Sequence, residues 1–243
     1  MYRVQKILSM IGILSRRECE KLLLQKKIKI NNGIATIGAK VKIGDKILVN
    51  KKTYIVSPEI FKSKIKIIAY YKSVGELVTT KDDKHRKTVF AHLPDVNGKW
   101  INIGRLDMNT SGLLLFTNNG DIANALMHPS SKIKRVYEVS IKGNITKEKI
   151  ILSKKGIDIG KGEIGKFLNI VQIKNELPNT YKITLITGKN REIRRVFDSL
   201  DCKVVKLKRI KYALVELSNL KVNKYRSLNR KEIRGIIKYL KND

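Results

Sequence analysis

The chain has 243 residues, of which 42% are hydrophobic, and its 52 Lys and Arg outnumber its 21 Asp and Glu to give a net charge of +31. This length suits two compact domains, or one domain with an appendage, and the apolar content permits a buried core. Residues 1–60 hold 13 basic and 4 acidic residues, or +9, which leaves +22 for the rest and excludes a single charged tail. A basic surface of this extent indicates a nucleic-acid partner. The alternative is biased use of Lys, Ile and Asn without any binding.

Cysteine and histidine usage gives no indication of a metal site. Cys19 and Cys202 lie far apart without CxxC spacing, and His85, His92 and His128 do not pair with them. No disulfide framework is expected either, which fits a reducing cytosol. Because no apolar run reaches 18 residues and the N-terminus lacks a signal-peptide core, we expect a soluble cytoplasmic protein without a membrane partner.

The first fifty residues predict two helices and a hairpin. Helical spacing of Val4, Ile7, Leu8 and Ile11 indicates a short helix that ends at Gly12. Ser15 and Glu18 then form a capping box for a second helix, whose buried face is expected at residues 22–24. Asn32-Gly33 predicts a tight hairpin turn after residues 28–31. Further strand residues are expected at Val41, Ile47 and Val49.

Four cations of this region are candidate RNA contacts. Arg16 and Arg17 lie in the first turn of the second helix, where the helix dipole already concentrates positive charge, and Lys26 and Lys27 follow its far end. A phosphate contact would compensate this cost, whereas a solvated basic face is the alternative. The order of helix, SRRE helix and KIxINNG hairpin resembles the S4 RNA-binding domain over residues 2–50, which implies that the two helices bind RNA. Residues 50–64 are expected to be a linker, so the domains are placed at 1–60 and 61–243.

The remaining chain predicts an α+β domain. Strands are expected at Ile65–Tyr71, Leu77–Thr80, Trp100–Ile103, Leu113–Phe116, Val136–Ile141, Phe167–Ile173, Tyr181–Ile186 and Val204–Tyr212. Helices are expected at Asp121–Met127, Thr146–Ser153, Asn190–Leu200 and Asn229–Leu240. Since no βαβ rhythm or nucleotide-binding glycine motif is present, a mixed, mostly antiparallel sheet is predicted.

Two segments of this domain hold charged residues in informative positions. Arg105 and Asp107 lie on a polar loop between two expected strands, which suits a reactive anion beside a phosphate-binding cation. In the helix expected at residues 190–200, Arg191 and Arg195 face solvent or RNA, whereas Arg194 lies at the edge of the apolar stripe and can point into a cleft. The turn at residues 188–190, which includes Lys189, offers free N–H groups for an anion. An ordinary amphipathic helix is the alternative. Tyr137 is either a core tyrosine or a platform for an unstacked base.

Four segments together resemble the pseudouridine synthases of the RsuA/RluB class: Tyr70–Thr80, Gly104–Asp107 (GRLD), Lys134–Tyr137 and Gly188–Arg195. The S4-like domain precedes them as it does in that class, and Gly75–Leu77 and Met127–Ser131 are most similar to members that modify 23S rRNA. Three residues depart from the usual pattern: Ser73 replaces proline, Lys189 an arginine and Glu192 a glutamine. Without the fixed φ of proline, the loop at Ser73 is expected to be looser.

The resemblance implies a mechanism. Asp107 would be the nucleophile, attacking C1′ of the ribose or C6 of the base or assisting elimination to a glycal. Arg194 would hold Asp107 charged and oriented, since burial alone disfavours a carboxylate. Tyr137 would stack on the uracil and assist loss of the C5 proton, and Arg105 would fill the gap that the flipped uridine leaves.

The implied substrate is ribosomal RNA, with 23S rRNA, naked or in an assembling large subunit, as the expected target of a monomeric enzyme. The isomerisation needs no redox step, so no cofactor and no metal are expected. Two alternatives stay open: a non-catalytic S4-type RNA-binding or ribosome-assembly protein, and the same chemistry on small-subunit rRNA or another large-subunit site. A nuclease is not supported, because clustered carboxylates for two metals are missing from the sequence.

Overall fold

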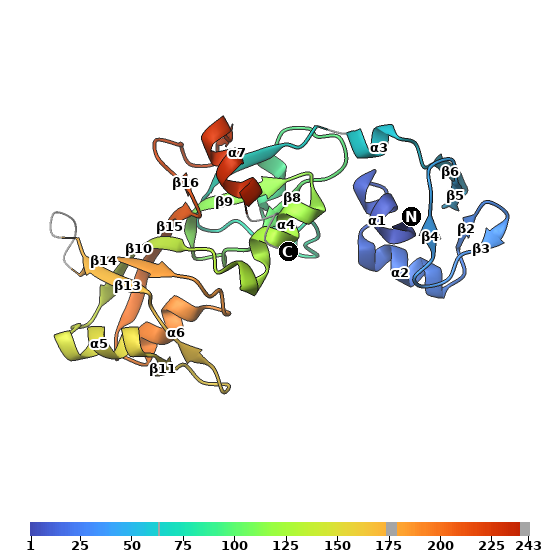
Figure 1. The fold of residues 1–243 in the computed structure, drawn as a ribbon. Coiled ribbons are helices and arrows are strands. Elements are labelled where there is room, and N and C mark those ends of the chain that lie inside the picture. The colour runs from blue at the N-terminus through green and yellow to red at the C-terminus, as the bar shows by residue number, and fades with distance from the viewer. Residues whose placement is uncertain (63, 174–178, 239–243) are drawn as a thin grey trace. The chain divides into compact units, whose positions relative to one another are not determined.

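The computed structural model describes residues 1–62, 64–173 and 179–238 and divides into two compact units (Figure 1). The first unit contains Met1–Lys66 together with Pro94–Ile101 and Asn118–Gly120. The second contains Ile67–Leu93, Asn102–Thr117 and Asp121–Asp243. Within the described ranges, none of the helices combines the length and apolarity that crossing a membrane requires.

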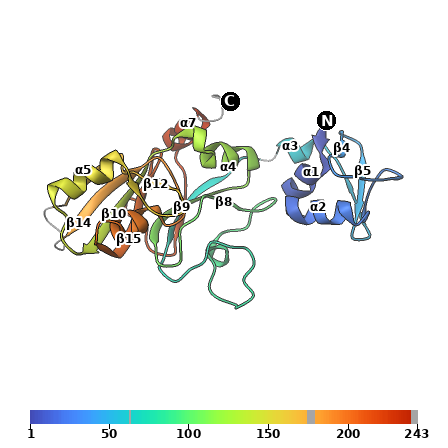
Figure 2. The same ribbon diagram turned by 90° about the horizontal axis from the view of Figure 1, so that it is seen from below.

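The N-terminal unit packs two helices against short strands (Figure 2). Its elements are β1 (Tyr2–Arg3), α1 (Val4–Met10), α2 (Arg16–Leu24), β2 (Ile28–Ile30), β3 (Gly33–Ile34), β4 (Lys40–Val41), β5 (Lys46–Val49), β6 (Lys52–Ile55) and α3 (Glu59–Lys62). Strands β3-β2-β5-β6 form an antiparallel sheet, and β1 pairs with β4. The capping box at α2 is confirmed, because Glu18 N donates to Ser15 Oγ and Ser15 N donates to Glu18 Oε2.

Three expectations for this unit were wrong in detail. The hairpin turn lies one residue earlier than expected, at residues 31–32, where Asn31 takes the left-handed conformation that asparagine tolerates (φ 53°). Leu24 is exposed, and the buried face of α2 consists of Cys19 and Leu23. The expected linker at 50–64 contains β6 and α3 instead, because Val56 is fully buried and Phe61 stacks on Tyr2.

The second unit is built on one large sheet. Its strands are β7 (Ile67–Lys72), β8 (Ile101–Ile103), β9 (Ser111–Thr117), β10 (Arg135–Lys142), β13 (Asn169–Gln172), β14 (Thr180–Leu185), β15 (Lys203–Tyr212), β16 (Val215–Glu216) and β17 (Tyr225–Ser227). In the described part of the chain the sheet order is β13-β14-β10-β15-β9-β7-β17, with β8 on β9 and β16 on β15. Strands β9 and β15 run parallel, and the other registered pairs of this path are antiparallel. The predicted α+β class with a mixed, mostly antiparallel sheet is confirmed.

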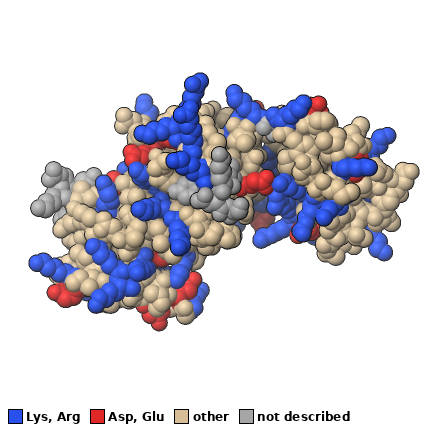
Figure 3. Space-filling model, in the orientation of Figure 1, with Lys and Arg blue, Asp and Glu red and all other residues tan. Residues whose placement is uncertain are grey.

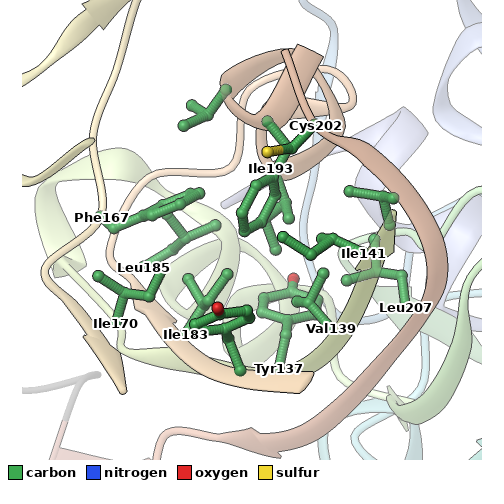
Figure 4. Packing of buried hydrophobic residues seen from close by; sticks show 14 of the residues in the cluster. Tyr137, Val139, Ile141, Phe167, Ile170, Ile183, Leu185, Ile193, Cys202 and Leu207 are labelled. Atoms are coloured by element: carbon green, nitrogen blue, oxygen red, sulfur yellow. The ribbon is translucent and has the colours of Figure 1, made fainter. Parts of the chain in front are cut away.

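Helices and a small hairpin cover this sheet. They are η1 (Val89–His92), α4 (Gly120–Met127), η2 (Pro129–Ser131), α5 (Lys147–Lys155), α6 (Glu192–Asp198), α7 (Arg230–Ile237) and the pair β11 (Ile157–Asp158) and β12 (Ile164–Gly165). Figure 1 shows α5 and α6 together at the β13-β14-β10 end of the sheet. The core there joins Tyr137, Val139 and Ile141 of β10 to Ile183 of β14 and Ile193 of α6 (Figure 4). The sheet and α6 are therefore fixed to each other by apolar packing.

Two of the expected elements differ here. Leu77–Thr80 is not a strand, because only Leu77 bridges Thr88 and the following loop folds on itself, with the Asp82 carboxylate accepting from Arg86 N. The helix expected from Asn190 begins at Glu192, because Arg191 is left-handed (φ 49°) and interrupts the turn. The last residues of the helix expected to reach Leu240 lie outside the described residues.

Candidate active site

Asp107 lies on the loop that joins β8 to β9. Gly104 opens this loop with a φ of 73°, which favours glycine, and Thr110 N donates to the carbonyl of Asp107 to close a turn. Gly75 N donates to the carbonyl of Met108 at 2.8 Å, so a second loop restrains the first. The carboxylate of Asp107 is thus held on a short, cross-braced turn, with its side chain 28% exposed.

Lys72 supports this loop from behind. It is fully buried at the end of β7, and its Nζ donates to the carbonyls of Ser73 (2.9 Å) and Thr110 (2.8 Å). Burial lowers the pKa of Lys72 to about 8, against the opposing influence of the Glu76 and Asp107 carboxylates. No separate pattern in the sequence indicates Lys72, although it falls within the segment that carries the family resemblance.

Ser73 does not leave its loop loose, contrary to expectation. Its backbone N–H and its hydroxyl both donate to Oε2 of Glu76, each at 2.9 Å. The hydroxyl of Tyr70 donates to the other oxygen of Glu76 at 2.8 Å. Burial and this contact with Glu76 raise the pKa of Tyr70, so the phenol remains a donor. Hydrogen bonds therefore replace the rigidity that a proline ring would provide.

Arg194 reaches Asp107 as the helix-edge position predicted. Its Nε lies 3.5 Å from Oδ2 of Asp107. Its Nη2 donates to the carbonyl of Asn109 (2.9 Å) and its Nη1 to that of Val204 (3.3 Å). With 8% of the residue exposed, the guanidinium is buried. Among the described residues Oδ1 of Asp107 is buried and has no hydrogen-bond donor, so the exposed part of this side chain lies at its other atoms.

Tyr137 lies in the middle of β10, paired with Ile183 of β14 and Arg209 of β15. It is 8% exposed and belongs to the apolar core, yet it also lines the cleft that contains Asp107. The interpretation as a core tyrosine is confirmed, and the platform for an unstacked base stays a prediction.

The cleft has a volume of about 1100 Å³ and lies wholly within the second unit. Asp107, Tyr137 and Arg194 all line it, so the structure brings the three predicted catalytic residues together. Its cationic lining residues are Lys81, Arg86, Arg105, Arg135, Lys189, Arg191, Arg194 and Arg209. This wall suits a polyanionic ligand. Arg135 and Arg209 were not singled out from the sequence, because both fall in strands where basic residues recur without a pattern.

The predicted RNA-binding residues of the second unit have different surroundings. Arg105 and Arg191 are exposed on the cleft wall. Lys189 lines the cleft as well, but its Nζ donates to the carbonyl of Ile164 at 2.5 Å. Arg195 donates to the carbonyls of Ile159 and Gly160 and pairs with Glu163. The expectation that Arg195 faces solvent or RNA was wrong, because its guanidinium is bound to the β11–β12 hairpin.

The expected anion site at residues 188–190 is occupied by a carboxylate of the chain itself. Glu192 is 3% exposed, and it accepts from Lys189 N (3.1 Å) and from the hydroxyl of Thr187 (2.7 Å). An external anion would compete with this carboxylate for the same N–H group. We therefore correct the prediction of an anion site at this turn.

The four candidate cations of the N-terminal unit are all exposed. Arg16 and Arg17 begin α2, and Lys26 and Lys27 follow its end. Figure 3 shows Lys and Arg side chains across the visible surface of each unit, with fewer Asp and Glu among them. On this visible face the positive charge is distributed over the surface, as the composition predicted.

Comparisons with known proteins agree with this geometry. Residues 66–199 match the RNA pseudouridylate synthase family and residues 3–47 match the S4 domain. A ribosomal large subunit pseudouridine synthase B from Buchnera aphidicola subsp. Schizaphis graminum is 43% identical over 234 residues, covering 93% of this chain and 90% of the relative. Its counterpart from Vibrio vulnificus is 38% identical over 218 residues, covering 88% and 68%.

A solved structure shares the fold. The crystal structure of a pseudouridylate synthase superposes with a TM-score of 0.69 at 23% identity, covering 97% of this chain and all of that one. The family match spans more than half of the chain and contains the cleft residues Asp107, Tyr137 and Arg194. The protein belongs to the RNA pseudouridylate synthase family.

Proposed function

We propose that this protein converts a uridine of large-subunit ribosomal RNA to pseudouridine, with Asp107 as its nucleophile. The observation that carries the proposal is the pairing of Asp107 with the buried guanidinium of Arg194 in a cleft lined by cations. The relatives that cover both units are named for the large ribosomal subunit, which supports 23S rRNA as the substrate. The proposed enzyme is monomeric.

The reaction breaks the N1–C1′ bond, turns the uracil and joins C5 to C1′. The C5 proton is lost and N1 gains one, so atoms and charge balance without an oxidant, a reductant or a cofactor. An ionised Asp107 attacks C1′ or C6, or assists elimination. Arg194 keeps the carboxylate charged, since an adjacent guanidinium offsets the cost of partial burial.

The uridine must leave its stack to reach this carboxylate. Flipping costs a few kcal/mol, which stacking and phosphate contacts offset. Tyr137 packs against the uracil, and the exposed Arg105, two residues from the nucleophile, fills the gap left in the RNA. The N-terminal unit, with Arg16, Arg17, Lys26 and Lys27, binds the surrounding RNA.

Asp107→Asn tests the role of the nucleophile. The variant keeps the shape of the side chain but removes the charge, so pseudouridine formation in 23S rRNA should be lost while RNA affinity stays within about threefold. Asp198→Asn is the matched control, because this exposed carboxylate lies on α6 and does not line the cleft. Turnover by Asp107→Asn at the wild-type rate would remove Asp107 from the mechanism.

The substrate is tested separately by mapping pseudouridines in cellular rRNA with and without the gene. Loss of one site in 23S rRNA supports the proposal. Loss of a small-subunit site would identify the same chemistry on the other subunit. An unchanged map would favour a non-catalytic RNA-binding protein. In vitro reactions with naked 23S rRNA and with precursor particles then identify the form of the substrate.

A further inference from the structure

Arg209 lies at the floor of the cleft, in the middle of the sheet. It belongs to β15, where its neighbours in register are Tyr137 of β10 and Gly112 of β9. Because β9 directly follows the loop of Asp107, Arg209 is placed between the nucleophile's loop and the proposed stacking tyrosine. It is 2% exposed and is the largest of the fully buried side chains in the described residues.

The contacts of Arg209 leave part of its guanidinium unused. Its Nε donates to the carbonyl of Leu113 at 2.7 Å, and its guanidinium carbon lies 5.2 Å from the centre of the Tyr212 ring. Nη2 is buried and has no hydrogen-bond partner in the described part of the chain. Among the described residues, no carboxylate forms an ion pair with Arg209. Buried donors are normally satisfied, and the ring face compensates only in part.

A comparison with Arg135 shows that this is not the pattern of a structural arginine. Arg135 also lines the cleft and lies 5.2 Å from the Tyr212 ring. Its Nη1 donates to the carbonyls of Ile186 (3.0 Å) and Thr187 (3.1 Å), so it ties two strand ends together. Arg209 donates to the carbonyl of Leu113, and its buried Nη2 has no hydrogen-bond partner in the described residues.

We propose that Arg209 is a catalytic residue whose guanidinium donates a hydrogen bond to a carbonyl oxygen of the flipped uracil. This inference rests on the proposed function of the cleft. The depth of Arg209 favours the base over a phosphate as the acceptor. Phosphates remain with the RNA backbone, where exposed cations such as Arg105 and Arg191 are available, whereas the base is the part that reaches the floor beside Tyr137.

The chemistry gives this contact a function. When the N1–C1′ bond breaks, its electron pair moves onto the uracil and is delocalised over N1, O2 and O4. A fixed guanidinium donor at one of these oxygens stabilises the departing base, and the protein need not reorganise to provide it. No proton is transferred from Arg209. The same donor stays bonded to the base until C5 faces C1′ and the new bond forms.

Arg209→Lys and Arg209→Gln test the proposal with two RNA substrates that differ only at the target base, uridine or 5-fluorouridine. Fluorine makes the departing uracil a weaker base, so its departure depends less on a donor. In both variants, single-turnover loss of the target nucleoside should slow by about 10–100-fold on uridine and by less on 5-fluorouridine. The rate on 5-fluorouridine divided by the rate on uridine should therefore rise at least fivefold relative to wild type. RNA affinity should stay within threefold. An equal loss on both substrates would indicate a merely structural role and overturn the proposal.

Wild-type protein provides a second test that does not depend on the folding of a variant. Sulfur is a poor hydrogen-bond acceptor. If the target uridine is replaced by 2-thiouridine or 4-thiouridine, the substrate whose sulfur replaces the oxygen that Arg209 contacts should react at least tenfold more slowly than uridine. Equal rates for both thio substrates and uridine would contradict the proposal. A methylphosphonate 5′ to the target removes the phosphate charge. If it costs wild type more than it costs Arg209→Gln, Arg209 binds phosphate and the proposal is wrong.

Lys206→Met is the matched control, because Lys206 is an exposed cation of the same strand outside the cleft lining. It should keep the wild-type ratio of rates. Failure of the proposed function has a different signature: wild-type protein would then form no pseudouridine in any rRNA. Failure of the present inference requires an active wild-type enzyme whose Arg209 variants retain the wild-type ratio.

Discussion

The guanidinium of Arg194 meets Asp107 with Nε alone, 3.5 Å from Oδ2, while its two other nitrogens bind main-chain carbonyls. A bidentate pair would engage both carboxylate oxygens and reduce their freedom to react. Here the carbonyls of Asn109 and Val204 determine where the guanidinium points, and the carboxylate is only adjacent to it. The proposed role of Arg194 is therefore to supply charge and to orient the carboxylate through its Nε alone.

Replacing Arg194 should separate catalysis from RNA binding. Arg194→Met removes the cation beside Asp107 and leaves two carbonyls without donors, so single-turnover activity should fall by roughly 10²–10³-fold, the usual effect of losing one electrostatic contact in an active site. Arg194→Lys should recover only part of this loss, because an ammonium cannot reproduce the planar fork. RNA affinity, measured by filter binding, should remain within about threefold for both variants. A Met variant as active as wild type would exclude the ion pair from the mechanism.

Tyr137 should tolerate loss of its hydroxyl better than loss of its ring. Tyr137→Phe keeps the aromatic surface that a base stacks on, so it should retain most of the activity. Tyr137→Ala removes a stacking contact worth about 1–3 kcal/mol as well as core packing. Single-turnover rates on the same rRNA, with thermal melting to correct for stability, give the comparison. The reverse order of the two variants would assign the chemistry to the hydroxyl.

Lys72 should make stability depend on pH in an unusual direction. Its pKa in the folded protein is about 8, below the ordinary value of 10.5, so between these values the unfolded chain binds more protons. Below pH 8 the cost of a buried charge is fully present, and it declines as the pH rises toward 10.5. The free energy of unfolding of wild type, relative to Lys72→Met, should therefore rise by about 2–3 kcal/mol from pH 7 to pH 10.5.

Urea denaturation of both proteins across this pH range measures that difference. The exposed Lys206 provides a control, because Lys206→Met should follow the pH dependence of wild type. Parallel curves for wild type and Lys72→Met would contradict the lowered pKa. Activity is expected to fall in Lys72→Met at every pH, since Met108, Thr110 and Ser73 lose the ammonium that their carbonyls accept from.

Arg16 and Arg17 should contribute to affinity through phosphate contacts. In the double variant Arg16→Ala/Arg17→Ala, the slope of log affinity against log salt concentration should decrease in magnitude by about 1–2, because each lost phosphate contact reduces it by nearly one. The rate at saturating RNA should be unchanged. Lys51→Ala/Lys52→Ala, on the exposed turn before β6 and at its start, is the control pair and should keep the wild-type slope. Equal slopes for wild type and the Arg16/Arg17 variant would remove α2 from the RNA-binding surface.

The sequence predicted those parts of the fold that depend on interactions between residues close together in the chain. The capping box at Ser15 and Glu18 and the apolar stripe of α6 both follow from side-chain chemistry within one turn. The prediction of a strand at Leu77–Thr80 failed because its β-branched residues favour a strand, while the Asp82–Arg86 contacts that fold the following loop back are specific to this segment. The prediction of a linker at residues 50–64 failed for another reason. The packing of this segment depends on residues distant in the sequence, such as Tyr2, which stacks on Phe61.

A site residue could be predicted where the helix or loop that contains it determines where its side chain points. Arg194 at a helix edge and Asp107 on a short loop meet those conditions. Arg195 does not, because the hairpin that binds it lies some thirty residues earlier, at Ile159 to Glu163. Arg209 does not either, since only the register of β15 with β9 and β10 places it beside Asp107 and Tyr137.

The parallel pairing of β9 with β15 can form only late in translation, because the two strands are far apart in the sequence. Arg209 binds the carbonyl of Leu113, which is 96 residues earlier in the chain. Helices α1 and α2 and strands β1–β6 all lie before residue 67, so their packing can be completed early in translation. The floor beneath Asp107 is still absent at that time, because β15 ends at Tyr212. A nascent chain thus exposes its N-terminal unit well before it has a cleft in which any nucleoside can react.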